Sequence, residues 1–346
     1  MKRIIFLFLI VLITVPGFTQ PHLQSVATVT LNKTEAITMG QLRTEVERME
    51  KAAGRVLTQA ERLQVLDVII NERLVLQAAE RDRIMVTENE LNQQMQQFRG
   101  EMAQQLGRQP TDSEFAQAIM SESGLEVNIF RDQLKRQLVL QKYLMHRKGD
   151  LINSVKIPTD AEIAAEYALL RSELVRPETI RFSMIQIPYG ADAASRAKAK
   201  TLADSLVREI NNDPSKFDEV AARSVAPNSG YVAGDAGYIP RNQEARQVMG
   251  QTFMDIAFGL RQGQVSRLIE GIQGFQVIKV TENYASKQLE LGDIFQLGTR
   301  ITVRDYVGQM MLNQRQQIIV SQASQELVSE LRTSRTFTIF ENNIRW

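Results

Sequence analysis

One stretch, residues 178–283, carries the pattern that most constrains how this chain folds. It opens with a strand pattern, continues with two helical patterns and a glycine-punctuated segment, and closes with a second strand pattern. These elements are predicted, in order, at 181–187, 195–210, 216–224, 230–238 and 274–280. Strand, helices, Gly-rich turn and strand together indicate a small α+β unit.

The residues before this stretch are typical of helices. Four Thr-x-x-Glu sequences have the spacing of a capping box, in which a hydroxyl and a carboxylate bind free amide groups at a helix start. They begin at Thr58, Thr87, Thr111 and Thr159. After Thr58, Leu63, Leu66, Ile70 and Leu74 form an apolar stripe at helical spacing. We therefore expect helices to dominate up to about residue 149.

The two ends of the chain are predicted to meet. Residues 26–38 alternate in part and turn at Asn32, which predicts a short hairpin. Residues 302–332 form a long helical pattern, and 336–340 alternate as a strand. Because a terminal strand needs a partner strand, the hairpin is the natural candidate. We expect the C-terminal helix and strand to complete the N-terminal helical domain.

Residues 1–20 resemble a secretory signal. Lys2 and Arg3 precede an apolar run over 4–15, and the small residues Gly17 and Thr19 follow it at cleavage-like spacing. The run is shorter than the ~20 residues of a membrane-spanning helix. An uncleaved anchor is the alternative. The pattern predicts an exported protein, periplasmic or otherwise extracytoplasmic, that meets the membrane only transiently through this signal.

Composition excludes several classes of function. Lys and Arg number 41 against 40 Asp and Glu, and this near-neutral balance does not favour nucleic-acid binding. Without Cys, neither disulfides nor thiolate metal sites can form. The two histidines, His22 and His146, are too far apart in sequence for a compact metal motif or triad. We expect no metal and no cofactor.

Several apolar side chains lie on Gln-rich segments and can be interpreted in two ways. They are Met95, Phe98, Met102, Leu106, Phe115, Ile119 and Met120. Methionine adapts its shape and is frequent on promiscuous binding surfaces. These residues are therefore either helical core or a groove for unfolded chains.

The stretch 178–283 resembles the parvulin (PpiC-type) family of peptidyl-prolyl isomerases. The matching positions, in order, are Lys216, Phe217, Ala221, Ser224, Gly234 to Tyr238, Phe253, Ala257, Phe258, Gly263 to Ser266, and 274–280. The resemblance implies that Met249 and Phe253 hold a proline ring, with Phe258 nearer the core.

Three departures from the family put catalysis in doubt. Met184 and Gln276 stand where the family has histidines, and Val225 and Ala226 stand where it has Cys or Asp. We expect Met184 and Gln276 to face each other across neighbouring strands. Methionine cannot donate a hydrogen bond, whereas glutamine both donates and accepts. No residue is assigned a catalytic role, and the predicted peptide-binding set is Met184, Met249, Phe253, Phe258 and Gln276.

Residues 29–151 resemble the N-terminal module of SurA- and PrsA-type extracytoplasmic chaperones. The resemblance rests on the order of the hairpin and the helical segments 66–76, 86–91 and 129–138. In that family a C-terminal helix and strand fold back on this module. The predicted domains are a signal peptide (1–20), a helical SurA-like domain with a hinge helix (21–177), an inserted parvulin-like α+β domain (178–283), and the returning helix and strand (284–346).

Three functions remain open at this point. The first is an ATP-independent chaperone of the SurA type, whose isomerase activity is weak or lost. Its clients are unfolded or partly folded envelope polypeptides, such as outer-membrane proteins awaiting assembly. The second is an active peptidyl-prolyl isomerase that works without the histidines. The third is a non-catalytic envelope scaffold with one fixed partner.

Overall fold

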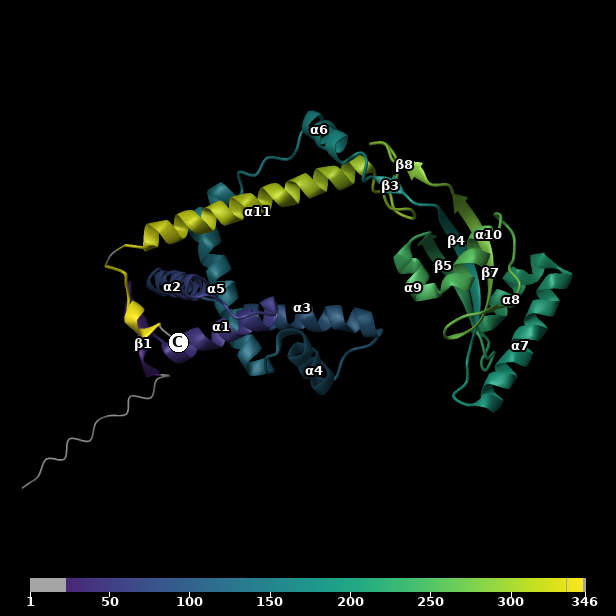
Figure 1. Cartoon of the computed structure of the whole chain (residues 1–346), viewed down its shortest axis with the longest axis horizontal. Helices are drawn as coiled ribbons and strands as arrows, with labels where there is room; N and C mark the ends of the chain where they lie inside the picture. Colours follow the sequence, from purple (N-terminus) through teal and green to yellow (C-terminus); the bar gives the residue numbers. More distant parts are fainter. Residues whose placement is uncertain (1–22, 334, 345–346) are drawn as a thin grey trace, which may run out of the picture. The chain divides into compact units, whose positions relative to one another are not determined.

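The computed structural model describes residues 23–333 and 335–344 and divides the chain into two compact units (Figure 1). The first comprises the described residues up to Val155 and those from Arg315 on, and the second comprises Lys156–Gln314. The predicted signal peptide lies outside the described residues. Within them, no helix has the length and apolar character needed to cross a bilayer.

Helices make up most of the first unit. They are α1 (Met39–Ala53), α2 (Gln59–Arg81), α3 (Glu88–Leu106), α4 (Asp112–Ser123) and α5 (Val127–Ile152), joined by the later part of α11 (Val303–Leu331). Thr58, Thr87 and Thr111 each cap a helix through the predicted reciprocal bonds, and Thr159 does so in the second unit. Thr38 forms a further capping box with Gln41, a pair that the Thr-x-x-Glu pattern misses.

A three-stranded sheet joins the two ends of the first unit. Strands β1 (Ser25–Thr30), β2 (Thr34–Thr38) and β9 (Phe337–Ile339) lie in the order β2-β1-β9, and Thr28 is paired with both Ala36 and Thr338. Leu327 and Leu331 of α11 lie in the same buried cluster as Val29 of β1. The prediction that a C-terminal helix and strand complete the N-terminal domain is therefore confirmed.

The second unit is built on a four-stranded antiparallel sheet (Figure 1). Its strands are β4 (Thr179–Pro188), β5 (Val232–Pro240), β6 (Ile269–Glu270) and β7 (Gly274–Tyr284), in the order β5-β4-β7-β6. The segment predicted as a Gly-rich turn, 230–238, is instead mostly strand β5. Its glycines suit a β-bulge opposite Phe182 and Ser183, where Gly237 takes a φ of 78°.

Successive residues of the central strands point to opposite faces of the sheet. Ile185 and Val277 pack against α7 (Ala193–Asn212) and α8 (Phe217–Ala222). Phe182 and Ile278 lie on the other face. That face is covered by α9 (Gln243–Met249) and α10 (Gln251–Gly259) (Figure 1).

A smaller cluster completes the second unit. Helix α6 (Asp160–Leu170), the strand pair β3 (Val175–Arg176) and β8 (Lys287–Gln288), and the first residues of α11 surround it. Its buried members are Ile163, Leu174, Leu289, Val303 and Val307. The compact unit thus extends on both sides of the predicted 178–283 domain.

Candidate peptide-binding site

An apolar groove of about 500 Å³ lies over strands β4 and β5 beside α9. It is lined by Phe182, Met184, Ala236, Tyr238, Ile239, Pro240, Asn242, Glu244, Ala245, Val248 and Met249. Ligand sites of this kind are mostly apolar with a few polar groups, so the groove suits an apolar peptide side chain or a proline ring.

The chain between β5 and α9 fixes the wall of this groove. The amide of Arg241 donates to the carbonyl of Glu178 over 2.7 Å, which holds the end of β5 beside the start of β4. The Asn242 side chain then accepts from the amide of Ala245 over 2.8 Å and caps α9. Gly250, with a φ of 85°, ends α9 directly after Met249. Met249 therefore lines the groove at the point where α9 ends.

The predicted peptide-binding residues differ in how far they lie beneath the surface of the groove. Met184 and Met249 line the groove together. Phe253 is only 1% exposed, and its ring centroid lies 5.5 Å from that of Phe182, so it forms part of the support beneath the groove. Phe258 is buried in the core near it, under the Arg241 guanidinium. The role of these residues in peptide binding stays a prediction.

The register of the sheet corrects one expectation about the site. Met184 pairs with Ile278, and Gln276 pairs with Gln186, so Met184 and Gln276 are diagonal neighbours and do not face each other directly. Strand alternation gives the face on which a residue lies, but the register is set by the pairing itself.

Gln276 is 7% exposed and is not among the residues that line the groove. In the described part of the chain, its side-chain oxygen has no hydrogen-bond partner. A Cβ atom on Gly271 would lie 2.8 Å from that oxygen, so the glycine leaves room for the amide. A buried acceptor without a donor is costly, which makes this amide an unusual feature of the sheet.

A network of polar side chains, which sequence reasoning missed, borders the groove at Tyr238. The hydroxyls of Tyr238 and Tyr284 donate to the same oxygen of Glu282, over 3.0 and 2.6 Å, and Arg181 donates to its other oxygen over 2.8 Å. The bond from Tyr284, followed by that from Arg181, lowers the pKa of Glu282, and the Glu282 carboxylate raises the pKa of Tyr284 to about 12. The carboxylate is therefore ionised at neutral pH and fixes both rings. In the sequence, Tyr238 stands out only as a member of a Gly-rich motif, and no pattern there predicts this network.

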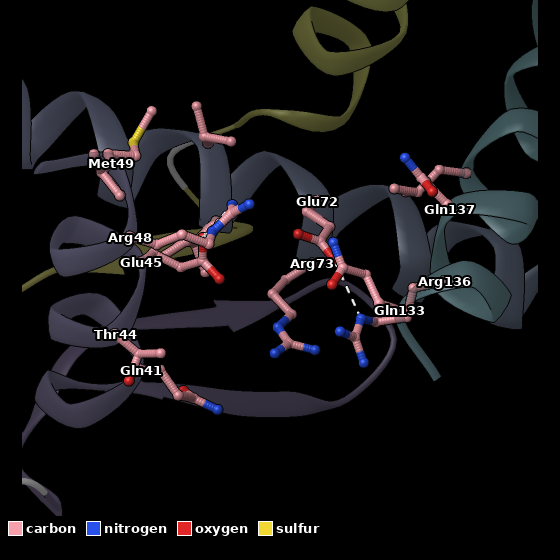
Figure 2. A pocket seen from close by; sticks show the side chains of 14 residues that line it. Gln41, Thr44, Glu45, Arg48, Met49, Glu72, Arg73, Gln133, Arg136 and Gln137 are labelled. Atoms are coloured by element: carbon pink, nitrogen blue, oxygen red, sulfur yellow. Dashed lines mark hydrogen bonds and ion pairs between the residues drawn. The ribbon is translucent and has the colours of Figure 1, made fainter. Parts of the chain in front are cut away.

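The first unit has a separate groove of about 440 Å³ between α1, α2 and α5 (Figure 2). Its apolar lining residues are Met49, Val65, Val68, Ile69 and Leu140. Ion pairs lie around them. Arg48 contacts Glu45 at 2.6 Å, and Arg136 points toward Glu72, 3.6 Å away (Figure 2). Apolar and charged side chains thus line this groove together, a mixture that also occurs on surfaces that bind polypeptides.

A second groove of the first unit, about 360 Å³, lies between α3, α4 and α5. Its lining includes most of the apolar side chains on the Gln-rich segments. The sequence allows two interpretations of these side chains, either as helical core or as a groove for unfolded chains. Phe115 and Ile119 are buried, Leu106 and Met120 are exposed, and Met95, Phe98 and Met102 are half-buried. Phe115 and Ile119 therefore belong to the core, and a role of the other residues in binding unfolded chains stays a prediction.

Comparison with known proteins identifies both parts of the chain. Residues 1–144 match the model of the SurA-like N-terminal domain, and residues 167–284 match that of the PPIC-type PPIase domain. The chaperone SurA of Pseudomonas savastanoi pv. phaseolicola is 28% identical over 255 residues, covering 70% of this chain and 54% of that protein. The foldase protein PrsA of Clostridium botulinum is 21% identical over 314 residues, covering 88% and 82%.

A solved structure of a SurA-like chaperone from Campylobacter jejuni is 13% identical, covers 92% of this chain and 100% of its own, and has a TM-score of 0.41. The chain spans about half the length of the curated SurA chaperones that it matches. The two matching domain models cover separate parts of the chain, in the order that the sequence predicts. The chain therefore carries a SurA-like N-terminal domain followed by a parvulin (PPIC-type) domain, and it is similar over most of its length to SurA and PrsA proteins.

Proposed function

We propose that the protein is an ATP-independent, extracytoplasmic chaperone of the SurA type that binds unfolded envelope polypeptides. The observation that carries this proposal is the apolar groove of Met184, Tyr238 and Met249 in the parvulin-like unit. Grooves of the SurA-like unit, with exposed Met49, Val68 and other apolar side chains, offer further surface for the same client. The apolar run near the N-terminus supports export.

Catalysis of prolyl isomerisation is weak or absent in this proposal. The uncatalysed barrier of ~18–20 kcal/mol comes from amide resonance, and polar groups that favour the twisted state lower it. The thioether of Met184 donates no hydrogen bond, and Gln276 is buried outside the groove lining. The groove therefore keeps an apolar pocket, and neither residue at the two positions where parvulins carry histidine presents a polar group to it. An active isomerase that works through the pocket alone is the alternative.

Aggregation of a denatured client tests chaperone function. The full-length protein is added to dilutions of urea-unfolded client, and light scattering is followed. Met249→Glu, which puts a charge into the groove, is expected to raise scattering toward the level without chaperone. Leu169→Glu is the matched control, because Leu169 is 77% exposed on α6 of the same unit and does not line the groove. Equal protection by both variants would contradict a client site in this groove.

Two further measurements separate the alternatives. Isomerisation of a proline peptide by the full-length protein is expected at the uncatalysed rate, with acceleration in Met184→His/Gln276→His. Clear acceleration by the natural chain favours the foldase. Protection of several unrelated clients argues against a scaffold with one partner, whereas protection of a single client favours it.

A further inference from the structure

Tyr238 lies within residues 167–284, which match the PPIC-type domain, but a segment beyond those residues also lies beside its ring. Its ring lines the groove, and its residue lies in the edge strand β5. The segment 289–302, which follows the matched residues 167–284, passes against the same ring. At Gly298, an added Cβ atom would lie 2.9 Å from Cε2 and 3.4 Å from Cδ2 of Tyr238.

Segment 289–302 is itself held in place. The amide of Leu289 donates to the carbonyl of Leu174 over 2.9 Å, and the amide of Phe295 donates to the carbonyl of Ile301 over 2.8 Å. The Phe295 ring stacks on Tyr306 of α11, with centroids 3.8 Å apart and planes 13° from parallel. The segment is therefore tied to β3 and to α11, which makes it a firm neighbour for the Tyr238 ring.

The backbone at Gly298 allows this close approach in two ways. Its φ of 80° lies in the region that side-chain-bearing residues rarely adopt. The absence of a Cβ atom also leaves the space that the ring edge needs beside this residue. On the hydroxyl side, Glu282 accepts from Tyr238 over 3.0 Å, and the Arg181 guanidinium carbon lies 5.3 Å from the ring centroid. The ring is thus confined by the strand network and by the segment together.

We propose that segment 289–302 sets the width of the peptide groove by supporting Tyr238, with Gly298 as the positioning residue. This inference rests on the proposed function, in which a peptide occupies that groove. A side chain at Gly298 displaces the ring, and the groove changes shape although no residue that touches the peptide has been replaced. The groove of the parvulin-like domain therefore depends on residues that lie beyond the match to its family.

The test measures binding of a fluorescein-labelled peptide with a central Leu-Pro-Phe sequence to the full-length protein by fluorescence anisotropy. Gly298→Ala is expected to weaken binding about fivefold, in the range that overpacking by one methyl group produces. Two glycines serve as matched controls. Gly263 has a similar φ of 84° and no atom within 4 Å of an added Cβ, and Gly292 lies in the same segment with equally open space. Gly263→Ala and Gly292→Ala are expected to leave the affinity unchanged.

A double substitution separates support of the ring from general disturbance of the segment. In a Tyr238→Val background the ring is absent, so adding Gly298→Ala is expected to change the affinity no further. If Gly298→Ala weakens binding equally in both backgrounds, the proposal is overturned, because the effect then does not pass through the ring. Equal affinities for Gly298→Ala and Gly263→Ala in the natural background overturn it too.

Met249→Glu distinguishes failure of this inference from failure of the proposed function. If this variant binds the peptide as tightly as the natural chain, the peptide does not occupy the groove, and both proposals fail. If it binds weakly while Gly298→Ala matches its controls, only the role of segment 289–302 is refuted.

Discussion

Replacing Gln77 tests how the first unit holds its N-terminal hairpin. Gln77 lies on α2 and is buried, and its side-chain oxygen accepts from the backbone amides of Leu31 and Asn32, over 3.1 Å each. Its nitrogen donates to Glu35 of β2 over 3.3 Å. One side chain thus binds the β1–β2 turn and an adjoining strand to the helix at the centre of the core.

Gln77→Met keeps the length of the side chain and removes these bonds. The backbone amides of Leu31, Asn32 and Lys33 lose their acceptor. Each unmade bond of a part-buried amide costs about 1 kcal/mol, so we expect the first unit to lose about 3 kcal/mol of unfolding free energy. The measurement is urea unfolding of the full-length protein, combined with hydrogen exchange of residues 25–38 and 337–339, because two units need not unfold in one step.

Gln64→Met is the matched control for this prediction. Gln64 lies on the same helix and is exposed, so its replacement is expected to change stability by less than about 0.5 kcal/mol. Exchange is expected to accelerate across β1, β2 and β9 only in Gln77→Met. A stability for Gln77→Met within experimental error of the Gln64→Met value would refute the reasoning.

Three further predictions concern the same unit. Hydrogen bonds from Arg81 and then Tyr143 lower the pKa of Asp82 to about 2, so its stabilising contribution is present above the ordinary pKa near 4 and is lost as the pH falls toward 2. Tyr143→Phe raises that pKa, and urea unfolding at several pH values should show the difference from the natural chain shrinking as the pH falls through this range. Thr87→Ala removes the cap of α3 and is expected to cost about 1 kcal/mol, seen as faster exchange in its first turn. Arg332→Met removes a cation–π contact 4.4 Å from the Phe337 ring centroid and an ion pair to α2, and is expected to accelerate exchange in β9.

Local patterns in the sequence predicted the elements that depend on local chemistry. Thr58 and Thr87 start helices because hydroxyl and carboxylate at that spacing bind the first free amides, wherever the helix later packs. The return of the C-terminal strand to the hairpin was also predictable, since alternating residues at a chain end need a partner strand.

Features that depend on register and on distant segments were not predictable in this way. The glycines of 230–238 resemble a turn, but bulges accept glycine equally well, and only the pairing with β4 makes the segment a strand. The diagonal placement of Met184 and Gln276 follows from a register that includes an irregularity between Arg181 and Phe182. The support of Tyr238 by Gly298 joins residues that no sequence pattern connects.

Site-specific photo-crosslinking tests the central claim most directly, namely that the groove of the parvulin-like unit receives unfolded polypeptide. A photoreactive phenylalanine derivative is placed at Val248, which lines the groove and is 71% exposed. In a second protein it is placed at Leu169, which is 77% exposed and does not line the groove. Each is irradiated with a urea-diluted client. We predict strong crosslinking from position 248 and little from position 169, and we expect Met249→Glu to reduce the crosslinking from position 248. Equal crosslinking from both positions, unaffected by that substitution, would contradict the claim.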